Sequence, residues 1–179
     1  SPALFKQCFD IICSYPAQEI SYNKLLGQLQ DKGNTDLIKY YLELFEEAFL
    51  IKQIFKYTNK KVLTRSSSPK ILPGCPALYS VGLDAQLNSE ERGRSFELMI
   101  GAQLMRLPGE LFYWREGDFE VDFIYKYGKK LYGLEVKSGR KKKQGGLEKF
   151  KSNFPTAEIL IVTPENFLKV FESIIPTYA

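Results

Sequence analysis

The chain has 179 residues, of which 44% are hydrophobic and 26% are charged, a balance typical of a soluble globular protein. Its net charge is +4, a surplus that is compatible with nucleic-acid binding but too small to indicate it. Histidine is absent, which excludes Ser-His and Cys-His catalysis and any imidazole metal ligand, so chemistry here would rely on carboxylates, Lys, Tyr or a bound ion.

The three cysteines, Cys8, Cys13 and Cys75, are odd in number and include no Cys-x-x-Cys pair. This pattern predicts neither a disulfide framework nor a zinc site, and we expect buried, reduced thiols in a cytoplasmic protein. No signal peptide and no apolar run long enough to span a membrane is recognisable, so no membrane contact is expected.

The first 65 residues have the pattern of a winged helix-turn-helix-like unit, in which helical periodicity gives way to strand periodicity. The expected elements are helices over 3–14, from Ser21 to about Gly33 and after Asn34 or Thr35, then strands over 50–57 and 61–65. The third helix would be the recognition helix, but its polar positions are Asp36, Lys39, Glu43, Glu46 and Glu47. Because an acidic face repels phosphate, packing or protein interaction is favoured over DNA reading.

Residues 66–92 contain Ser-Pro and Pro-Gly breaks and are expected to be a connector with one short strand near 78–81. A second domain, 93–179, follows with a different order of elements. We expect a helix over 90–107, a strand over 111–115, a hairpin over 120–137, a helix over 145–153, a buried strand over 158–163 and a helix over 165–174. The last two strands should run parallel, because a helix separates them.

The hairpin turns at Gly128-Lys129, where Gly suits the positive φ of a type II′ turn. This turn predicts the register, with three apolar pairs on one side of the sheet: Val121 with Val136, Phe123 with Leu134, and Tyr125 with Tyr132. The same register predicts charged pairs on the other side.

Those charged pairs are Asp122 opposite Glu135 and Glu120 opposite Lys137. Directly opposed residues have Cβ atoms roughly 5 Å apart, so two carboxylates there must share a proton or hold a cation. A hard ion such as Mg²⁺ takes such ligands. The alternative is that these charges only mark the solvated face of a strand.

The order α-β-β-β-α-β, with Asp on the second strand and Glu-x-Lys on the third, resembles the PD-(D/E)XK nuclease superfamily over residues 93–163. The resemblance implies an α/β (α+β) restriction-endonuclease-like core with a mixed sheet, which binds Mg²⁺ or Mn²⁺ and hydrolyses phosphodiesters. By position it implies metal binding by Asp122, Glu135 and Glu97, and a lysine, Lys137, that orients or activates water. The alternatives are that Lys137 is an ion-pair partner of Glu120, and that Glu97 is one exposed acid among many.

The whole chain is similar to the C-terminal domain of unknown function found behind bacterial and archaeal AAA-type ATPases. The matching pieces are 93–97, Tyr113-Trp114-Arg115, 120–123 and 135–139. This resemblance implies an upstream ATPase module, whereas the chain itself lacks a P-loop and so an ATP site of that kind. Residues 73–76, Pro-Gly-Cys-Pro, depart from the family pattern.

A basic run, Arg140-Lys141-Lys142-Lys143, follows the hairpin and is either a contact for a nucleic-acid backbone or a solvated loop. Tyr113 and Trp114 are expected to pack in the core or at its rim. Two functions remain open. The first is metal-dependent hydrolysis of DNA phosphodiesters, and the second is a catalytically inactive module that binds partners or regulates the attached ATPase.

Overall fold

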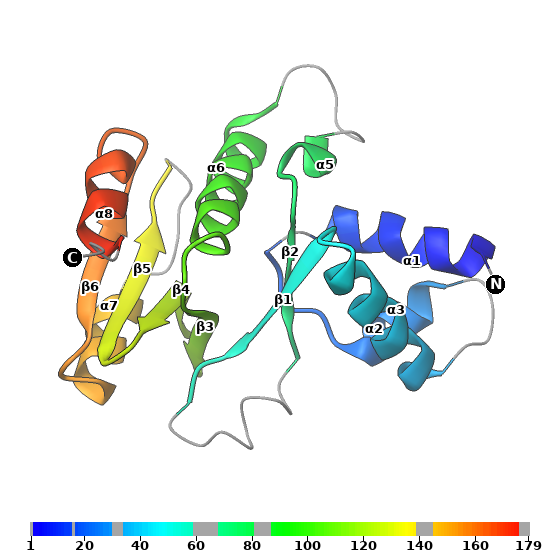
Figure 1. Ribbon diagram of the computed structural model, residues 1–179, viewed down its shortest axis with the longest axis horizontal. Coiled ribbons are helices and arrows are strands. Elements are labelled where there is room, and N and C mark those ends of the chain that lie inside the picture. The colour runs from blue at the N-terminus through cyan, green and yellow to red at the C-terminus, as the bar shows by residue number, and fades with distance from the viewer. Residues whose placement is uncertain are drawn as a thin grey trace.

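The computed structural model, drawn in Figure 1, places three small N-terminal helices at one end of the molecule and the C-terminal strand and helix at the other. It describes six stretches of the chain: 2–15, 17–29, 34–58, 68–80, 87–138 and 145–175. Among the described helices none is long and apolar enough to cross a membrane.

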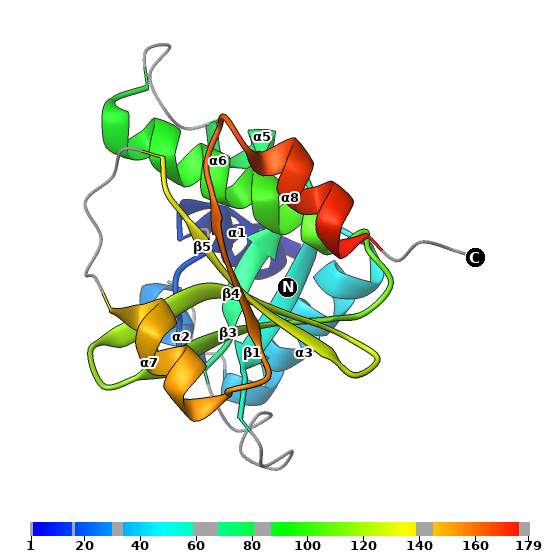
Figure 2. The ribbon, with the colours of Figure 1, turned by 90° about the vertical axis from the view of Figure 1, so that its left-hand side faces the viewer.

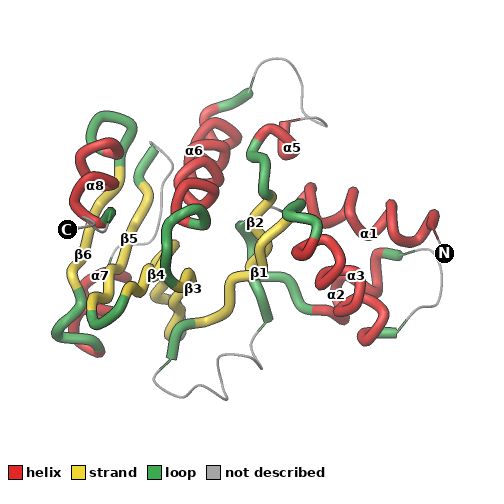
Figure 3. The backbone as a smooth tube through the Cα atoms, in the orientation of Figure 1, coloured by secondary structure: helices red, strands yellow, loops and turns green. Residues whose placement is uncertain are grey.

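Six strands form one mixed sheet in the order β2-β1-β3-β4-β5-β6, shown in yellow in Figure 3. The strands are β1 Ile51–Lys56, β2 Lys70–Pro73, β3 Glu110–Glu116, β4 Phe119–Tyr127, β5 Lys130–Val136 and β6 Glu158–Val162. Strand β1 is parallel to β3 and β5 is parallel to β6, while the other neighbours are antiparallel. The predicted parallel pairing of the last two strands is confirmed.

Helices cover the sheet on both faces. The described residues form seven helices: α1 Pro2–Ser14, α2 Tyr22–Gln28, α3 Thr35–Glu47, α5 Ala77–Ser80, α6 Ser89–Leu104, α7 Gly146–Asn153 and α8 Phe167–Ile174. Figure 2 shows α6 and α8 on one side of the strands and α7 on the other. Leu98 of α6 and Val170 of α8 belong to the same buried cluster as Phe123 of β4, whereas Phe150 of α7 and Ile124 of β4 belong to another. The result is a three-layer α/β arrangement.

Helices α1, α2 and α3 enclose a separate core, as the helical periodicity predicts. Ser21 caps α2 and Asn34 caps α3, each accepting a bond from a backbone amide three residues on. Helix α2 ends at Gln28, five residues before the expected Gly33. In α3 the deepest apolar residues include Ile38 and Leu42, which are fully buried.

The connector contains an unexpected strand. Strand β2, Lys70–Pro73, is buried and pairs with β1 in an antiparallel register. The prediction of a strand near 78–81 is wrong, because Ala77–Ser80 form the short helix α5. Pro76 precedes this helix with the φ that a first helical turn needs. The second expected strand of the wing, 61–65, lies outside the described residues.

The second half follows the predicted order of elements. Asn88 and Glu91 form a capping box at the start of α6. The turn at Gly128 has a φ of +58° and no positive φ at Lys129, as a type II′ turn requires. The observed register pairs Phe123 with Leu134 and Tyr125 with Tyr132, as predicted.

Some burial predictions are wrong. Strand β6 is not buried but lies at the sheet edge, with Ile159 and Ile161 more than two-fifths exposed. Cys8 is buried as expected, but Cys75 is exposed. On α6, Gln103 is exposed, whereas Leu98 and Ala102 are buried.

Candidate functional site

The buried charged side chains of the described residues include all three acids that the sequence singled out. Glu97 is 4% exposed, Asp122 is 5% exposed and Glu135 is 8% exposed, and the fourth buried charge is Lys70. Burying a charged group is costly unless it is paired, hydrogen-bonded or bound to an ion. These acids are therefore held in place by specific interactions, and Glu97 is not the exposed acid of the alternative interpretation.

Strand β4 carries an irregularity at Asp122. Its pairing with β3 shifts by one residue between Phe112–Ile124 and Trp114–Val121, so one extra residue lies on β4. A bulge of this kind interrupts the alternation of side chains between the two faces. Val121 accordingly packs on the α7 side, while Phe123 packs on the α6 side. The prediction that both face the same side is wrong.

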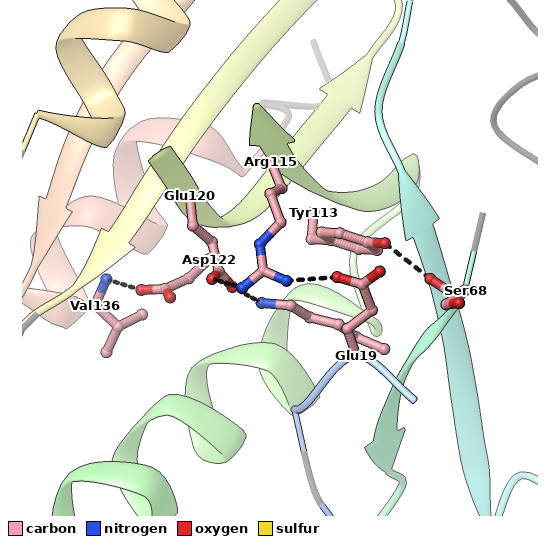
Figure 4. Close-up of polar contacts among 8 residues, drawn as sticks. Glu19, Ser68, Tyr113, Arg115, Glu120, Asp122 and Val136 are labelled. Carbon is pink, nitrogen blue, oxygen red and sulfur yellow. Dashed lines mark hydrogen bonds and ion pairs between the residues drawn. The ribbon is translucent and has the colours of Figure 1, made fainter. Parts of the chain in front are cut away.

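The bulge changes what Asp122 does. In an unbroken ladder counted from the two-residue turn, the amide of Val136 would donate to the carbonyl of Val121. It donates instead to Oδ2 of Asp122, at 2.8 Å and fully buried, as Figure 4 shows. The regular pairing ends at Phe123 and Leu134, so the expected opposition of Asp122 and Glu135 is replaced by a side-chain bond next to Glu135.

Helix α6 meets the same end of β5. The hydroxyl of Ser138 donates to the carbonyl of Gly93 at 3.2 Å. Glu97 lies four residues after Gly93, on the same face of α6. Asp122 and Glu135 thus lie at the carboxyl end of β5, Glu97 lies on the helix that meets this end, and each of the three acids takes part in at least one further interaction.

The acids do not form a ready-made three-ligand metal site. In the stretches that the structure describes, no three Asp, Glu or Cys side chains are arranged to hold a metal ion. Mg²⁺ is often held by only one or two carboxylates, with waters and phosphate oxygens completing its shell. The donor set therefore fits a hard divalent ion that two carboxylates and solvent would share.

Lys137 follows Val136 and is exposed. Its amide donates to the carbonyl of Val162 at 2.8 Å, which extends the pairing of β5 with β6. Its ammonium makes no ion pair with any described residue. The predicted pairing of Glu120 with Lys137 is wrong, because Glu120 pairs with Lys70 and Arg115.

Glu120 belongs to a charged network that sequence reasoning missed (Figure 4). Arg115 donates from Nη1 to Glu19 at 2.7 Å and from Nη2 to Glu120 at 2.9 Å, and Lys70 pairs with Glu120. Partial burial lowers the pKa of Arg115, but the charges of Glu120 and Glu19 outweigh it and raise that pKa. The only signal in the sequence was a lysine in the apolar stretch Lys-Ile-Leu-Pro.

Two other predicted features have different outcomes. Tyr113 and Trp114 are 1% and 3% exposed, which confirms packing as their role. The basic run at 140–143 lies outside the described residues, so its place relative to the acids stays a prediction.

Comparison with known families divides the chain in two. Residues 92–178 match the model of a domain of unknown function, DUF4143. This domain is commonly found at the C-terminus of AAA-type ATPase proteins. Residues 1–83 match a second domain of unknown function, DUF8612. No curated protein and no solved structure shows significant similarity to the chain. The DUF4143 match supports the resemblance on which the ATPase association rests.

Proposed function

We propose that residues 93–179 form a PD-(D/E)XK-type domain that hydrolyses DNA phosphodiesters with the help of Mg²⁺ or Mn²⁺. The observation that carries the proposal is the burial of Glu97, Asp122 and Glu135 around one strand end, with the exposed Lys137 two residues beyond Glu135. The element order α6-β3-β4-β5-α7-β6 is that of the superfamily pattern.

In this proposal the carboxylates hold the ion, which lowers the pKa of a bound water and stabilises charge on the scissile phosphate. Lys137 positions that water or neutralises developing charge, a role that suits an ammonium without another ionic partner among the described residues. Arg140–Lys143 would contact the nucleic-acid backbone, and each contact would make binding more sensitive to salt.

The proposal extends to the rest of the molecule. Helices α1–α3 followed by the pair β1–β2 form a winged-helix-like unit, and residues 66–92 connect it to the nuclease-like domain. We place the chain behind an ATPase module in a longer cytoplasmic protein, in line with the DUF4143 match.

Two observations favour a second candidate, a catalytically inactive module that binds partners or regulates the ATPase. Oδ2 of Asp122 already accepts the amide of Val136, and no described trio of acids is arranged as a metal site. In such a module the three acids would be a polar cluster that holds the bulge in place.

A thermal-shift titration with Mg²⁺ and with Mn²⁺ separates the two candidates. An ion present at about one hundred times its Kd should stabilise the fold by about 2.7 kcal/mol, because it binds only the folded state. Glu135→Gln should remove this stabilisation, while Asp36→Asn, which changes an exposed acid of α3, should retain it.

No stabilisation in the wild type, or equal stabilisation in Glu135→Gln, would exclude the metal site. If the ion binds, cleavage of plasmid, duplex and branched DNA should be lost in Lys137→Met. Metal binding without cleavage of any DNA would favour the inactive module.

A further inference from the structure

The charged network links the N-terminal helices to the strand that carries Asp122. Glu19 lies between α1 and α2, Lys70 on β2, Arg115 on β3 and Glu120 on β4. Figure 4 shows Glu19 and Glu120 on either side of the Arg115 guanidinium, with Asp122 next to Glu120, and Lys70 pairs with Glu120. A network that joins four separate segments restrains their relative positions more than an isolated surface pair does.

The backbone fixes Glu19 beside β2. The amide of Ala17 donates to Ile71 and that of Ile20 donates to Pro69, both at 3.0 Å, and Glu19 forms a β-bridge with Lys70. The Glu19 carboxylate therefore moves with the helical unit and with β2 together.

Arg115 connects this unit to β4. Its planar guanidinium donates from two nitrogens to two carboxylates, Glu19 and Glu120, a geometry that a lysine cannot reproduce. Arg115 and Glu120 are also directly paired across β3 and β4.

Lys70 makes Glu120 indispensable to the network. Lys70 is 4% exposed, and its ammonium lies 5.2 Å from the ring centre of Tyr113. A charge buried so deeply needs its counter-charge, which Glu120 supplies. Tyr113 in turn donates to the carbonyl of Ser68 at 2.8 Å, which ties β3 to the entrance of β2.

The backbone of Glu120 is restrained as well. A Cβ placed on Gly146 would lie only 2.0 Å from the Glu120 carbonyl oxygen, so the start of α7 packs directly on β4 at this point. Glu120 is thus held from two directions, two residues before Asp122 and next to the bulge.

We propose that Glu19, Arg115, Glu120 and Lys70 are positioning residues that hold β4 in its bulged register and so aim Asp122 at Val136. The helical unit then controls where the Asp122 carboxylate lies. A partner that moved the α1–α2 connection would shift that carboxylate. The effect on metal binding rests on the proposed function, but the effect on the Asp122–Val136 bond does not.

Amide hydrogen exchange measured by NMR tests the positioning directly. Glu19→Gln removes one arm of the network without touching β4. We expect the amide of Val136 to exchange about two- to fivefold faster, the size expected for loss of a partly exposed ion pair. The amide of Leu134, which lies in the regular part of the ladder, should change less.

The matched control is Glu116→Gln. Glu116 neighbours Arg115 on β3 and pairs with Lys149 of α7, outside the network. This variant should leave the Val136-to-Leu134 exchange ratio unchanged. Arg115→Lys keeps the positive charge but cannot donate to Glu19 and Glu120 at the same time as the guanidinium does, so it should reproduce the effect of Glu19→Gln.

Two results would overturn the proposal. In the first, Glu19→Gln accelerates exchange of the Val136 and Leu134 amides equally. In the second, Glu116→Gln changes the Val136-to-Leu134 ratio of exchange rates as much as Glu19→Gln does, because either result would show only a general loss of stability. The affinity for Mn²⁺, measured by electron paramagnetic resonance, provides a second readout and should fall by a similar factor in Glu19→Gln. A wild-type chain that binds no Mn²⁺ would refute the proposed function, and the exchange ratio would still decide the positioning role.

Discussion

The three cysteines differ in the surroundings of their sulfur atoms. Burial raises the pKa of Cys8 from 9.0 to about 11, and burial together with the charge of Asp10 raises that of Cys13 to about 11. Cys75 is exposed. Because a raised pKa withholds the thiolate until the pH is higher, Cys8 and Cys13 should be poorly reactive at neutral pH.

We therefore expect a thiol reagent at pH 8 to modify Cys75 first. The thiolate fractions of Cys8 and Cys13 at that pH are about a hundredfold below those of a thiol with the ordinary pKa. The rapid phase should disappear in Cys75→Ser, and the slow phase should accelerate as the pH rises toward 11. Rapid modification of all three thiols would contradict the burial of Cys8 and Cys13.

At the scale of single residues, the sequence was sufficient to select the acids but not to describe their contacts. Alternating charge on a hairpin pointed to Asp122 and Glu135, and both are buried. Their predicted opposition is not part of the regular β4–β5 pairing, which ends at Phe123 and Leu134 beside the bulge between β3 and β4, and no residue type marks a bulge. The partners of Glu120 lie 50 residues away on β2 and five residues away on β3, and the first separation is beyond any local pattern.

At the scale of elements, two glycines test how closely helices approach their neighbours. Gly146 begins α7 against the backbone of Glu120, whereas Gly27 lies in α2 with nothing within 4 Å of an added Cβ. The same substitution should therefore have opposite effects at the two positions.

Gly146→Ala should destabilise the fold by about 1–3 kcal/mol, because α7 or β4 must move to admit the methyl group. Gly27→Ala should stabilise it by about 0.5–1 kcal/mol through the higher helix propensity of alanine. Urea unfolding of the two variants measures both. A similar change in the free energy of unfolding of both variants would show that α7 and β4 move apart at little cost.

Elements with strong local signals were predictable, and those that depend on distant partners were not. The Gly128 turn determines the β4–β5 register, and the caps at Ser21 and Asn34 mark helix starts. Strand β2 has four residues, includes a lysine and a proline, and exists because β1 pairs with it. Strand β6 has the apolar composition of a central strand, although its position at the sheet edge leaves Ile159 and Ile161 exposed.

At the scale of the whole molecule, the pair β1–β2 belongs to two cores. Ile51 and Ile71 pack with the N-terminal helices, while Ile54 and Leu72 pack with α6 and the rest of the sheet. The two cores therefore share one pair of strands, and unfolding of either removes support from the other.

This sharing predicts one cooperative transition. Trp114, the single tryptophan, reports on the sheet through its fluorescence, and circular dichroism at 222 nm reports largely on the helices. The two signals should have the same urea midpoint, and Leu72→Ala should lower both together by the equivalent of about 2–5 kcal/mol. Separate midpoints would show that the two cores unfold independently.

The sequence favoured two units joined by a connector, because its breaks at Pro69 and Pro73–Pro76 resemble a linker. Local composition cannot reveal that Lys70–Pro73 complete a sheet whose other strands lie on both sides of them in the sequence. The continuity of the sheet emerges only from long-range pairing of β1 with β3.

The shared sheet also has a consequence for the history of such chains. The two family matches end at 83 and begin at 92, yet β1 of the first match pairs with β3 of the second. Recombination at that boundary would have to preserve two ion pairs that cross it, Glu19 with Arg115 and Lys70 with Glu120. The two families should therefore be inherited together, and substitutions at these positions should be compensated across the boundary.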